Sequence, residues 1–151
     1  MRFFILDDDI NVIQILKRII EDKELGNIVG EETDGIKGLE KIRTTMPDIV
    51  LIDLLMPGMD GLNIVKKLKE EYDSIEFIMI SQVSSKAMVE KAYKYGVEYF
   101  IYKPINAVEV ETIIRKVMER IQINRTISSM QGILGRKRPA KVVETEEPYE
   151  N

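Results

Sequence analysis

The chain has 151 residues, of which 44% are hydrophobic, so a single compact domain with a core of ordinary size is expected. The charged fraction is 32% but the net charge is only −4, which excludes the strong basic excess of a nucleic-acid-binding surface. Cysteine and histidine are both absent, which excludes disulfides, zinc sites with thiolate or imidazole ligands, and catalytic triads built on histidine.

Five short apolar runs predict strands that are buried on both faces of a parallel sheet. They are Phe3–Leu6, Gly26–Gly30, Ile49–Ile52, Phe77–Ile80 and Val97–Tyr102. Each run is followed by apolar residues at helical spacing, which predict an amphipathic helix. These stripes are Ile10, Ile13, Leu16, Ile19 and Ile20; Ile36, Leu39 and Ile42; Leu62, Val65 and Leu68; Met88, Ala92 and Tyr95; and Val110, Ile114, Val117 and Ile121. The alternation predicts an α/β fold, a doubly wound five-stranded parallel sheet with right-handed crossovers.

Residues that favour helix ends fall at the expected boundaries. Asp34 is predicted to cap the second helix, Asp60 and Gly61 to open the third, and Ser84 or Ser85 to open the fourth. Gly96 follows the fourth helix, at a position that favours a left-handed backbone.

The last helix is predicted to extend beyond the domain. A second apolar stripe, Ile123, Ile127, Met130 and Leu134, starts out of register with the first. Two interpretations remain open: the stripe packs on a second protomer or a downstream domain, or it is a frayed end with scattered apolar residues. No periodicity survives from residue 136 onward. We therefore expect a compact domain over residues 1–122, a helical extension over 123–135 and a disordered tail over 136–151.

Polar side chains follow four of the five predicted strands, where a parallel sheet binds its ligands. Asp7, Asp8 and Asp9 follow the first strand, Asp53 ends the third, Ser81 ends the fourth and Lys103 follows the fifth. Each has an ordinary alternative: Asp7 to Asp9 could cap the first helix and Asp53 could be a loop acid. Ser81 could be a satisfied hydroxyl at a strand end, and Lys103 could be a solvated lysine. Their occurrence in this order favours a shared site.

These motifs resemble the receiver domain of bacterial two-component response regulators over roughly residues 1 to 122. The densest match runs from Asp48 through Asp53 and Pro57 to Asp60-Gly61, and Asp7-Asp8, Ser81 and Lys103-Pro104 complete it. The resemblance implies a flavodoxin-like (βα)5 fold with strand order 2-1-3-4-5 and, here, an extended C-terminal helix.

The resemblance also implies a phosphorylation site. Asp53 is the expected phosphoacceptor, and Mg²⁺, with Mn²⁺ as a possible substitute, is the expected cofactor. The expected metal ligands are Asp8 and Asp53 directly, Asp7 through water, and the backbone carbonyl of Leu55. Physical chemistry agrees, because neighbouring carboxylates repel one another and a hard cation relieves that repulsion.

The remaining site residues are expected to read the phosphoryl group. Lys103 would stabilise its charge and Ser81 would hydrogen-bond to it. Ser81 and Phe100 would form the switch, although Phe100 could simply fill the core. The Lys103–Pro104 peptide bond is expected to be cis.

The expected partner is a sensor histidine kinase, with small acyl phosphates as alternative donors. The chain would catalyse only its own phosphorylation and dephosphorylation, and would control a partner or an output domain, most often a transcriptional one, through its fourth and fifth helices and fifth strand. A homodimer through that face or through the final helix is possible.

Nucleic acid would be bound only by an output domain that is not visible here. No membrane span or signal peptide is evident, so we expect a cytoplasmic protein.

Other functions remain as alternatives. A stand-alone adaptor could relay phosphoryl groups, and a degenerate receiver could bind without phosphorylation. An aspartyl-phosphate hydrolase would need an aspartate at position 55, which is leucine, and a flavin phosphate would be repelled by Asp7 to Asp9. Leu55 and Val83 cannot activate water and Gln82 is bulky, so we expect a phosphoryl group that lasts for minutes or longer.

Overall fold

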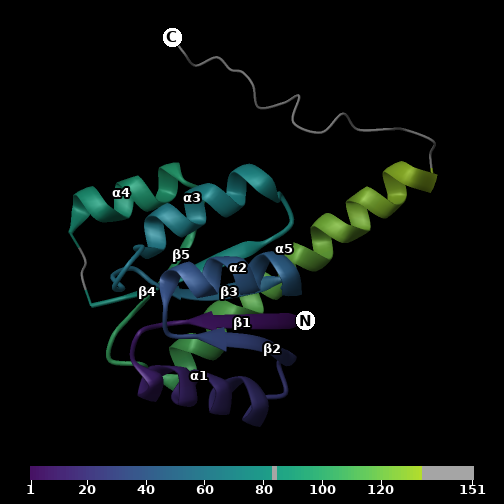
Figure 1. The fold of residues 1–151 in the computed structure, drawn as a ribbon. Helices are drawn as coiled ribbons and strands as arrows, with labels where there is room; N and C mark the ends of the chain where they lie inside the picture. The colour runs from purple at the N-terminus through teal and green to yellow at the C-terminus, as the bar shows by residue number, and fades with distance from the viewer. Residues whose placement is uncertain (83–84, 134–151) are drawn as a thin grey trace. The chain divides into compact units, whose positions relative to one another are not determined.

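A computed structural model describes residues 1–82 and 85–133, and within them five parallel strands alternate with five helices (Figure 1). The elements are β1 Arg2–Leu6, α1 Ile10–Asp22, β2 Asn27–Glu32, α2 Gly35–Thr45, β3 Ile49–Asp53, α3 Gly61–Glu71, β4 Glu76–Ser81, α4 Lys86–Lys94, β5 Tyr99–Tyr102 and α5 Ala107–Ile133. The strands pair in the order β2-β1-β3-β4-β5. The predicted fold class and strand order are therefore confirmed.

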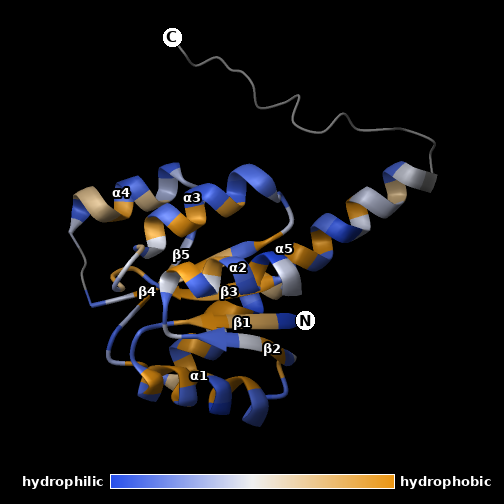
Figure 2. Ribbon diagram, viewed as in Figure 1, coloured by the Kyte–Doolittle hydropathy of each residue, from blue (hydrophilic) through white to orange (hydrophobic). Residues whose placement is uncertain are grey.

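The central strands are buried on both faces, as their continuous apolar sequences predict. Alternate residues of β1 and β3, such as Phe4 and Ile52, join one core cluster with Leu39, Leu68 and Ala92 of α2, α3 and α4. The intervening residues point to the other face because side chains alternate along a strand. Figure 2 shows this apolar character in β1 and β3, whereas the edge strand β2 carries hydrophilic residues and the helices show hydrophilic residues on their outer surfaces.

The helices begin where the sequence predicts. Asp34 caps α2 by accepting hydrogen bonds from the backbone N–H groups of Ile36 and Lys37, and Asp60 caps α3 in the same way. Ser85 caps α4, while Ser84, the alternative cap, lies outside the described residues. Gly96 follows α4 with φ of 102°, a left-handed conformation that glycine adopts without a steric penalty.

Two strand boundaries differ from the prediction by two residues, both on edge strands, and the other differences are of one residue. The second strand was expected to end at Gly30 but continues to Glu32, because Glu31 and Glu32 still pair with Ile5 and Leu6 of β1. The ion pairs Lys17–Glu31 and Lys41–Glu32, both 2.7 Å, accommodate the acidic side chains there. The fifth strand begins at Tyr99 and not at Val97. The Val97 N–H donates to the carbonyl of Ala92, so Val97 closes the end of α4.

Two residues of the predicted apolar stripes are exposed. Ile10 is 49% exposed and Ile36 is 54% exposed, whereas Ile13 and Ile42 are fully buried. Ile10 and Ile36 lie in the first turns of α1 and α2, next to the carboxyl edge of the sheet, where the strands no longer offer a surface to pack on. The prediction of a continuous buried stripe is wrong at these two positions.

The chain divides into two compact units, Met1–Val117 and Met118–Asn151. In the first unit Val110, Ile114 and Val117 of α5 are buried, as predicted. In the second unit α5 continues to Ile133, and Ile123, Ile127 and Met130 are exposed. The predicted domain boundary at residue 122 stays a prediction, and Leu134 and the tail 136–151 lie outside the described residues. No helix in the part of the chain that the structure describes is long and apolar enough to span a bilayer.

Gly61 holds the start of α3 against the end of β3. Its N–H donates to the Leu54 carbonyl at 2.8 Å, and a Cβ at this position would collide with the carbonyl oxygen of Asp53. Since the carbonyl oxygen of Asp53 belongs to the backbone and not to a flexible side chain, moving it would cost free energy.

We expect Gly61→Ala to lower the free energy of unfolding by about 2 kcal/mol, because α3 must shift away from β3. Gly132→Ala is the matched control: nothing lies within 4 Å of its Cβ position, so alanine should be neutral or stabilise α5 by up to about 1 kcal/mol. Urea unfolding of both variants measures the difference, and equal stabilities would contradict the role assigned to Gly61.

Candidate functional site

The carboxyl ends of four strands carry the residues that the sequence singled out. Asp53 is the last residue of β3 and pairs with Ile80, and Ser81 ends β4 opposite Tyr102, so Lys103 emerges beside Ser81. The Lys103 N–H donates to the Ser81 carbonyl at 2.9 Å, which fixes the two chain segments together. This register brings side chains from β1, β3, β4 and β5 to one place.

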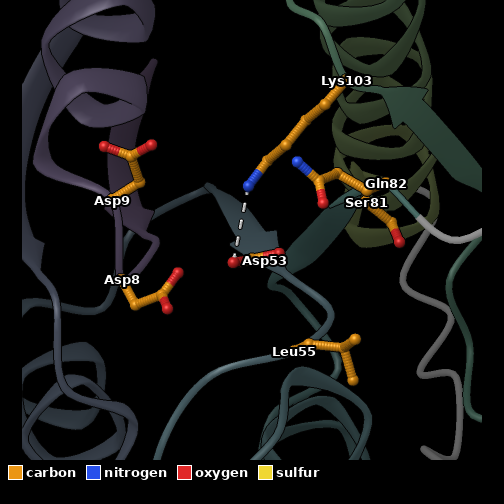
Figure 3. A pocket seen from close by; sticks show the side chains of 7 residues that line it. All are labelled: Asp8, Asp9, Asp53, Leu55, Ser81, Gln82 and Lys103. Carbon is orange, nitrogen blue, oxygen red and sulfur yellow. Dashed lines mark ion pairs between the residues drawn. The ribbon is translucent and has the colours of Figure 1, made fainter.

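These side chains surround a pocket of about 310 Å³ (Figure 3). Its lining residues are Asp8, Asp9, Asp53, Leu55, Ser81, Gln82 and Lys103. Figure 3 shows Asp8 and Asp9 on one side, Leu55 on another, and Lys103 reaching across toward Asp53. The structure thus brings together the predicted site residues, with Asp7 buried beneath the pocket.

Three carboxylates crowd this site. Asp7, Asp8 and Asp53 each place an oxygen within 4.8 Å of the others, and Asp7 and Asp53 are only 0% and 5% exposed. Burial, and then the charge of Asp7, raises the pKa of Asp53 to about 7 despite the nearby lysine. Burial also raises the pKa of Asp7, although the Asp9 N–H and Lys103 oppose that change.

Lys103 is the cation of the pocket. Its Nζ lies 3.2 Å from Asp7 Oδ2 and 3.6 Å from Asp53 Oδ2. Burial disfavours the charged ammonium, but Asp53 and Asp7 outweigh this cost and raise the pKa of Lys103. One ammonium cannot balance three carboxylates, so the ionised pocket retains negative charge.

The donor set suits a hard divalent cation. Asp7 Oδ1 accepts a hydrogen bond from the Asp9 N–H at 2.8 Å, but the buried Asp7 Oδ2 has no hydrogen bond of good geometry, even though Lys103 is near it. Carboxylate and carbonyl oxygens are the ligands that Mg²⁺ prefers. Asp7, Asp8 and Asp53 can therefore supply oxygens to such an ion, directly or through water.

Asp9 has a role different from those of Asp7 and Asp8, and the sequence alone did not distinguish the three. The three consecutive aspartates could all have capped the first helix, but only Asp9 does so, accepting from the Asn11 N–H at 2.9 Å. Its own N–H orients Asp7, so Asp9 supports the carboxylate cluster without joining it. The single signal for this role was its position next to Asp8.

The two expected switch residues occupy different surroundings. Ser81 is buried, and its hydroxyl points away from Asp53 in Figure 3. Phe100 is half-buried against the core, with its ring 5.8 Å from that of Tyr93 in an edge-on arrangement and 6.2 Å from that of Tyr102 in a stacked one. The Lys103–Pro104 peptide bond is cis.

Comparison with known proteins identifies the family of this domain. Residues 3–115 match the family model described as "Response regulator receiver domain". The chain is 47% identical over 138 residues to the transcriptional regulatory protein GlnL of Bacillus subtilis, covering 90% of this chain and 43% of GlnL. It is 32% identical over 116 residues to the chemotaxis protein CheY of Listeria monocytogenes, covering 77% of this chain and 97% of CheY.

Among solved structures, the chain resembles one from the CheX–CheY–BeF3–Mg²⁺ complex of Borrelia burgdorferi. The TM-score is 0.74 at 28% sequence identity, covering 78% of this chain and 89% of that one. The chain spans less than half the length of GlnL but nearly all of the Listeria CheY.

The crowding of acids predicts a pH-dependent stability for the metal-free protein. The pKa of Asp53 is about 7 in the folded state and near its ordinary value of 3.8 when unfolded. The folded state therefore binds more protons between these values, and its stability falls as the pH rises through this window.

Asp53→Asn should remove that loss and raise the free energy of unfolding at about pH 8 in a chelator by about 1 to 3 kcal/mol, with a smaller gain at about pH 5. Urea unfolding at both pH values measures it. Asp34→Asn, an exposed cap replaced by another good cap, is the control and should change little. An equal gain from Asp53→Asn at the two pH values would contradict the assignment.

Proposed function

The chain belongs to the family of response regulator receiver domains, and we propose that Asp53 accepts a phosphoryl group in a Mg²⁺-dependent signalling switch. The observation that carries this proposal is the placement of Asp53, buried among acids and 3.6 Å from the Lys103 ammonium, at the pocket beyond the sheet. A buried carboxylate facing both a cation and a candidate metal site is suited to attack phosphorus.

In this proposal a carboxylate oxygen of Asp53 attacks the phosphorus of the donor. The new O–P bond forms as the bond from phosphorus to the donor breaks, and the electron pair of that bond stays on the donor. Lys103 stabilises the charge on the phosphoryl oxygens as they pass. Asp8 and Asp53, with Asp7 through water and the Leu55 carbonyl, would hold Mg²⁺ or Mn²⁺, which when bound supplies further charge neutralisation.

The donor in this proposal is a sensor histidine kinase. The chain has no histidine, so a phosphohistidine must come from another protein. We assign the chain no reaction beyond the gain and loss of its own phosphoryl group, and we place it in the cytoplasm, where small acyl phosphates could also serve.

The proposed readout runs from Ser81 to Phe100. The Ser81 hydroxyl would turn toward the phosphoryl group, and Phe100 would move into the space vacated behind it. Phenylalanine has no hydroxyl, so the change would be one of packing: Phe100 would leave its contacts with Tyr93 and Tyr102. This would alter the surface of α4, β5 and the start of α5.

The proposed output is transcriptional, because GlnL is a transcriptional regulatory protein, and any contact with nucleic acid would lie in an output domain. Homodimers through the α4–β5–α5 surface or through Ile123, Ile127 and Met130 are part of the proposal, since those side chains are 46% to 56% exposed. A stand-alone adaptor that relays phosphoryl groups is the second candidate, because the chain is also similar to the chemotaxis protein CheY of Listeria monocytogenes.

Incubation with a small acyl phosphate and Mg²⁺ should add the mass of one phosphoryl group to the intact protein. Asp53→Asn should abolish this addition, because an amide is not nucleophilic enough to attack phosphorus. Asp34→Asn should be phosphorylated like the parent, since Asp34 lies at the start of α2 as an exposed cap. Intact mass spectrometry decides; phosphorylation of the Asp53→Asn protein would contradict the assignment.

The phosphoryl group is expected to last for minutes or longer. Leu55 lines the pocket and is 54% exposed, and an apolar side chain there cannot orient a water for attack on phosphorus. Val83, also expected to slow the loss, lies outside the described residues. Leu55→Asn should shorten the half-life severalfold by adding a polar group that can orient water. A half-life of seconds in the parent would contradict this expectation.

A further inference from the structure

Gln82 and Asp9 line the pocket without a part in the proposed function, and of the two only Gln82 can donate a hydrogen bond to an anion. It follows Ser81 at the end of β4, is exposed, and lines the pocket together with Asp53 and Lys103. In Figure 3 its amide group points toward the side of the pocket where Asp53 and the end of Lys103 lie, whereas the Ser81 hydroxyl points away. The chain therefore directs a neutral polar group, which can both donate and accept, toward the space in front of Asp53.

The register of the sheet explains this position. Asp53 pairs with Ile80, and Gln82 lies two residues beyond that partner. At a rise of about 3.3 Å per residue, its backbone lies about 7 Å past the level of Asp53, beyond the carboxyl end of β3. A phosphoryl group attached to Asp53 would enter this same pocket, so the Gln82 side chain is placed to meet it.

The pocket is poor in hydrogen-bond donors. When ionised, the side chains of Asp8, Asp9 and Asp53 offer only hydrogen-bond acceptors. The side chain of Leu55 offers neither a donor nor an acceptor. A phosphoryl group brings about −1.5 to −2 charge and three strong acceptor oxygens, so it needs donors. Lys103 supplies one cationic donor, and Ser81 supplies a hydroxyl that points away from Asp53 in Figure 3. The amide of Gln82 is the remaining side-chain donor among the lining residues, and it is directed inward.

We propose that the Gln82 side-chain amide donates a hydrogen bond to the phosphoryl group on Asp53 and so strengthens its retention. This inference rests on the proposed function, because it requires Asp53 to carry the group. An amide N–H facing an anionic oxygen forms a charge-assisted hydrogen bond, which is stronger than a neutral one. Gln82 is thus a positioning residue for the phosphoryl group.

The test measures binding of beryllium fluoride, an inorganic mimic of the phosphoryl group, to the full chain in Mg²⁺. Gln82→Met keeps the length of the side chain and removes the donor, and should weaken this binding roughly tenfold. Gln82→Glu keeps the shape and adds a negative charge, and should weaken binding of the mimic further.

Affinity for Mg²⁺ alone should stay unchanged for Gln82→Met. Gln14→Met, the same change on an exposed residue of α1, is the matched control and should match the parent in both assays.

A spectroscopic readout distinguishes the effect of the Gln82 hydrogen-bond donor from the effect of its side-chain bulk. The ¹⁹F resonances of bound beryllium fluoride should shift in Gln82→Met relative to the parent, because one fluorine loses a donor. If Gln82→Met binds the mimic as tightly as the parent while Gln82→Ala does not, side-chain bulk is responsible and the inference is overturned. If Gln82→Met weakens Mg²⁺ alone to the same degree, Gln82 acts on the metal site and the inference is again overturned. If the parent itself does not bind the mimic, the proposed function fails and this inference fails with it.

Discussion

The repulsion among three carboxylates at one edge of the sheet is the constraint on which the rest of this structure depends. Asp7 and Asp53 are almost fully buried, Asp8 is close to both, and a single ammonium faces them. Such an arrangement opposes folding, so the apolar core must offset it. The free energy of folding that this repulsion costs can be recovered when a ligand binds. A cation, or an anion bound with its counter-ion, binds more tightly because it relieves the repulsion among the carboxylates.

The backbone, and not the side chains, holds the site in place. Asp53 and Ser81 are the last residues of neighbouring parallel strands, the Leu54 N–H continues the ladder to the Ile80 carbonyl, and the Gly61 N–H ties α3 to Leu54. Asp9 caps α1 and orients Asp7 at once. The backbone hydrogen bonds that hold the ends of β3 and β4 involve no ionisable group, so these strand ends keep their positions when the charge of the pocket changes.

Much of this was predictable because it is local. Continuous apolar runs predicted every strand and apolar residues at a period of 3.6 predicted every helix. The polar residues at the strand ends predicted the site, since strand ends meet at one edge in a parallel sheet. What could not be predicted depends on distant parts of the chain. The glutamates at the end of β2 pair with Ile5 and Leu6 of β1, and the ring contacts of Phe100 join α4 to β5. Nor could the sequence reveal that Ile10 and Ile36 lie where the sheet offers no surface.

The double contact of Lys103 has a consequence for the order of events. Its ammonium lies between Asp7 and Asp53 and, in the absence of a metal, serves as their shared counter-ion. A metal ion that neutralises Asp7 would free the Lys103 ammonium to interact with a phosphoryl group on Asp53. Conversely, a phosphoryl group that attracts Lys103 would leave Asp7 free to interact with the metal ion. Because such coupling is reciprocal, each ligand would tighten the binding of the other to the same extent. A single flexible side chain can thus make two inorganic ligands cooperative within one small pocket.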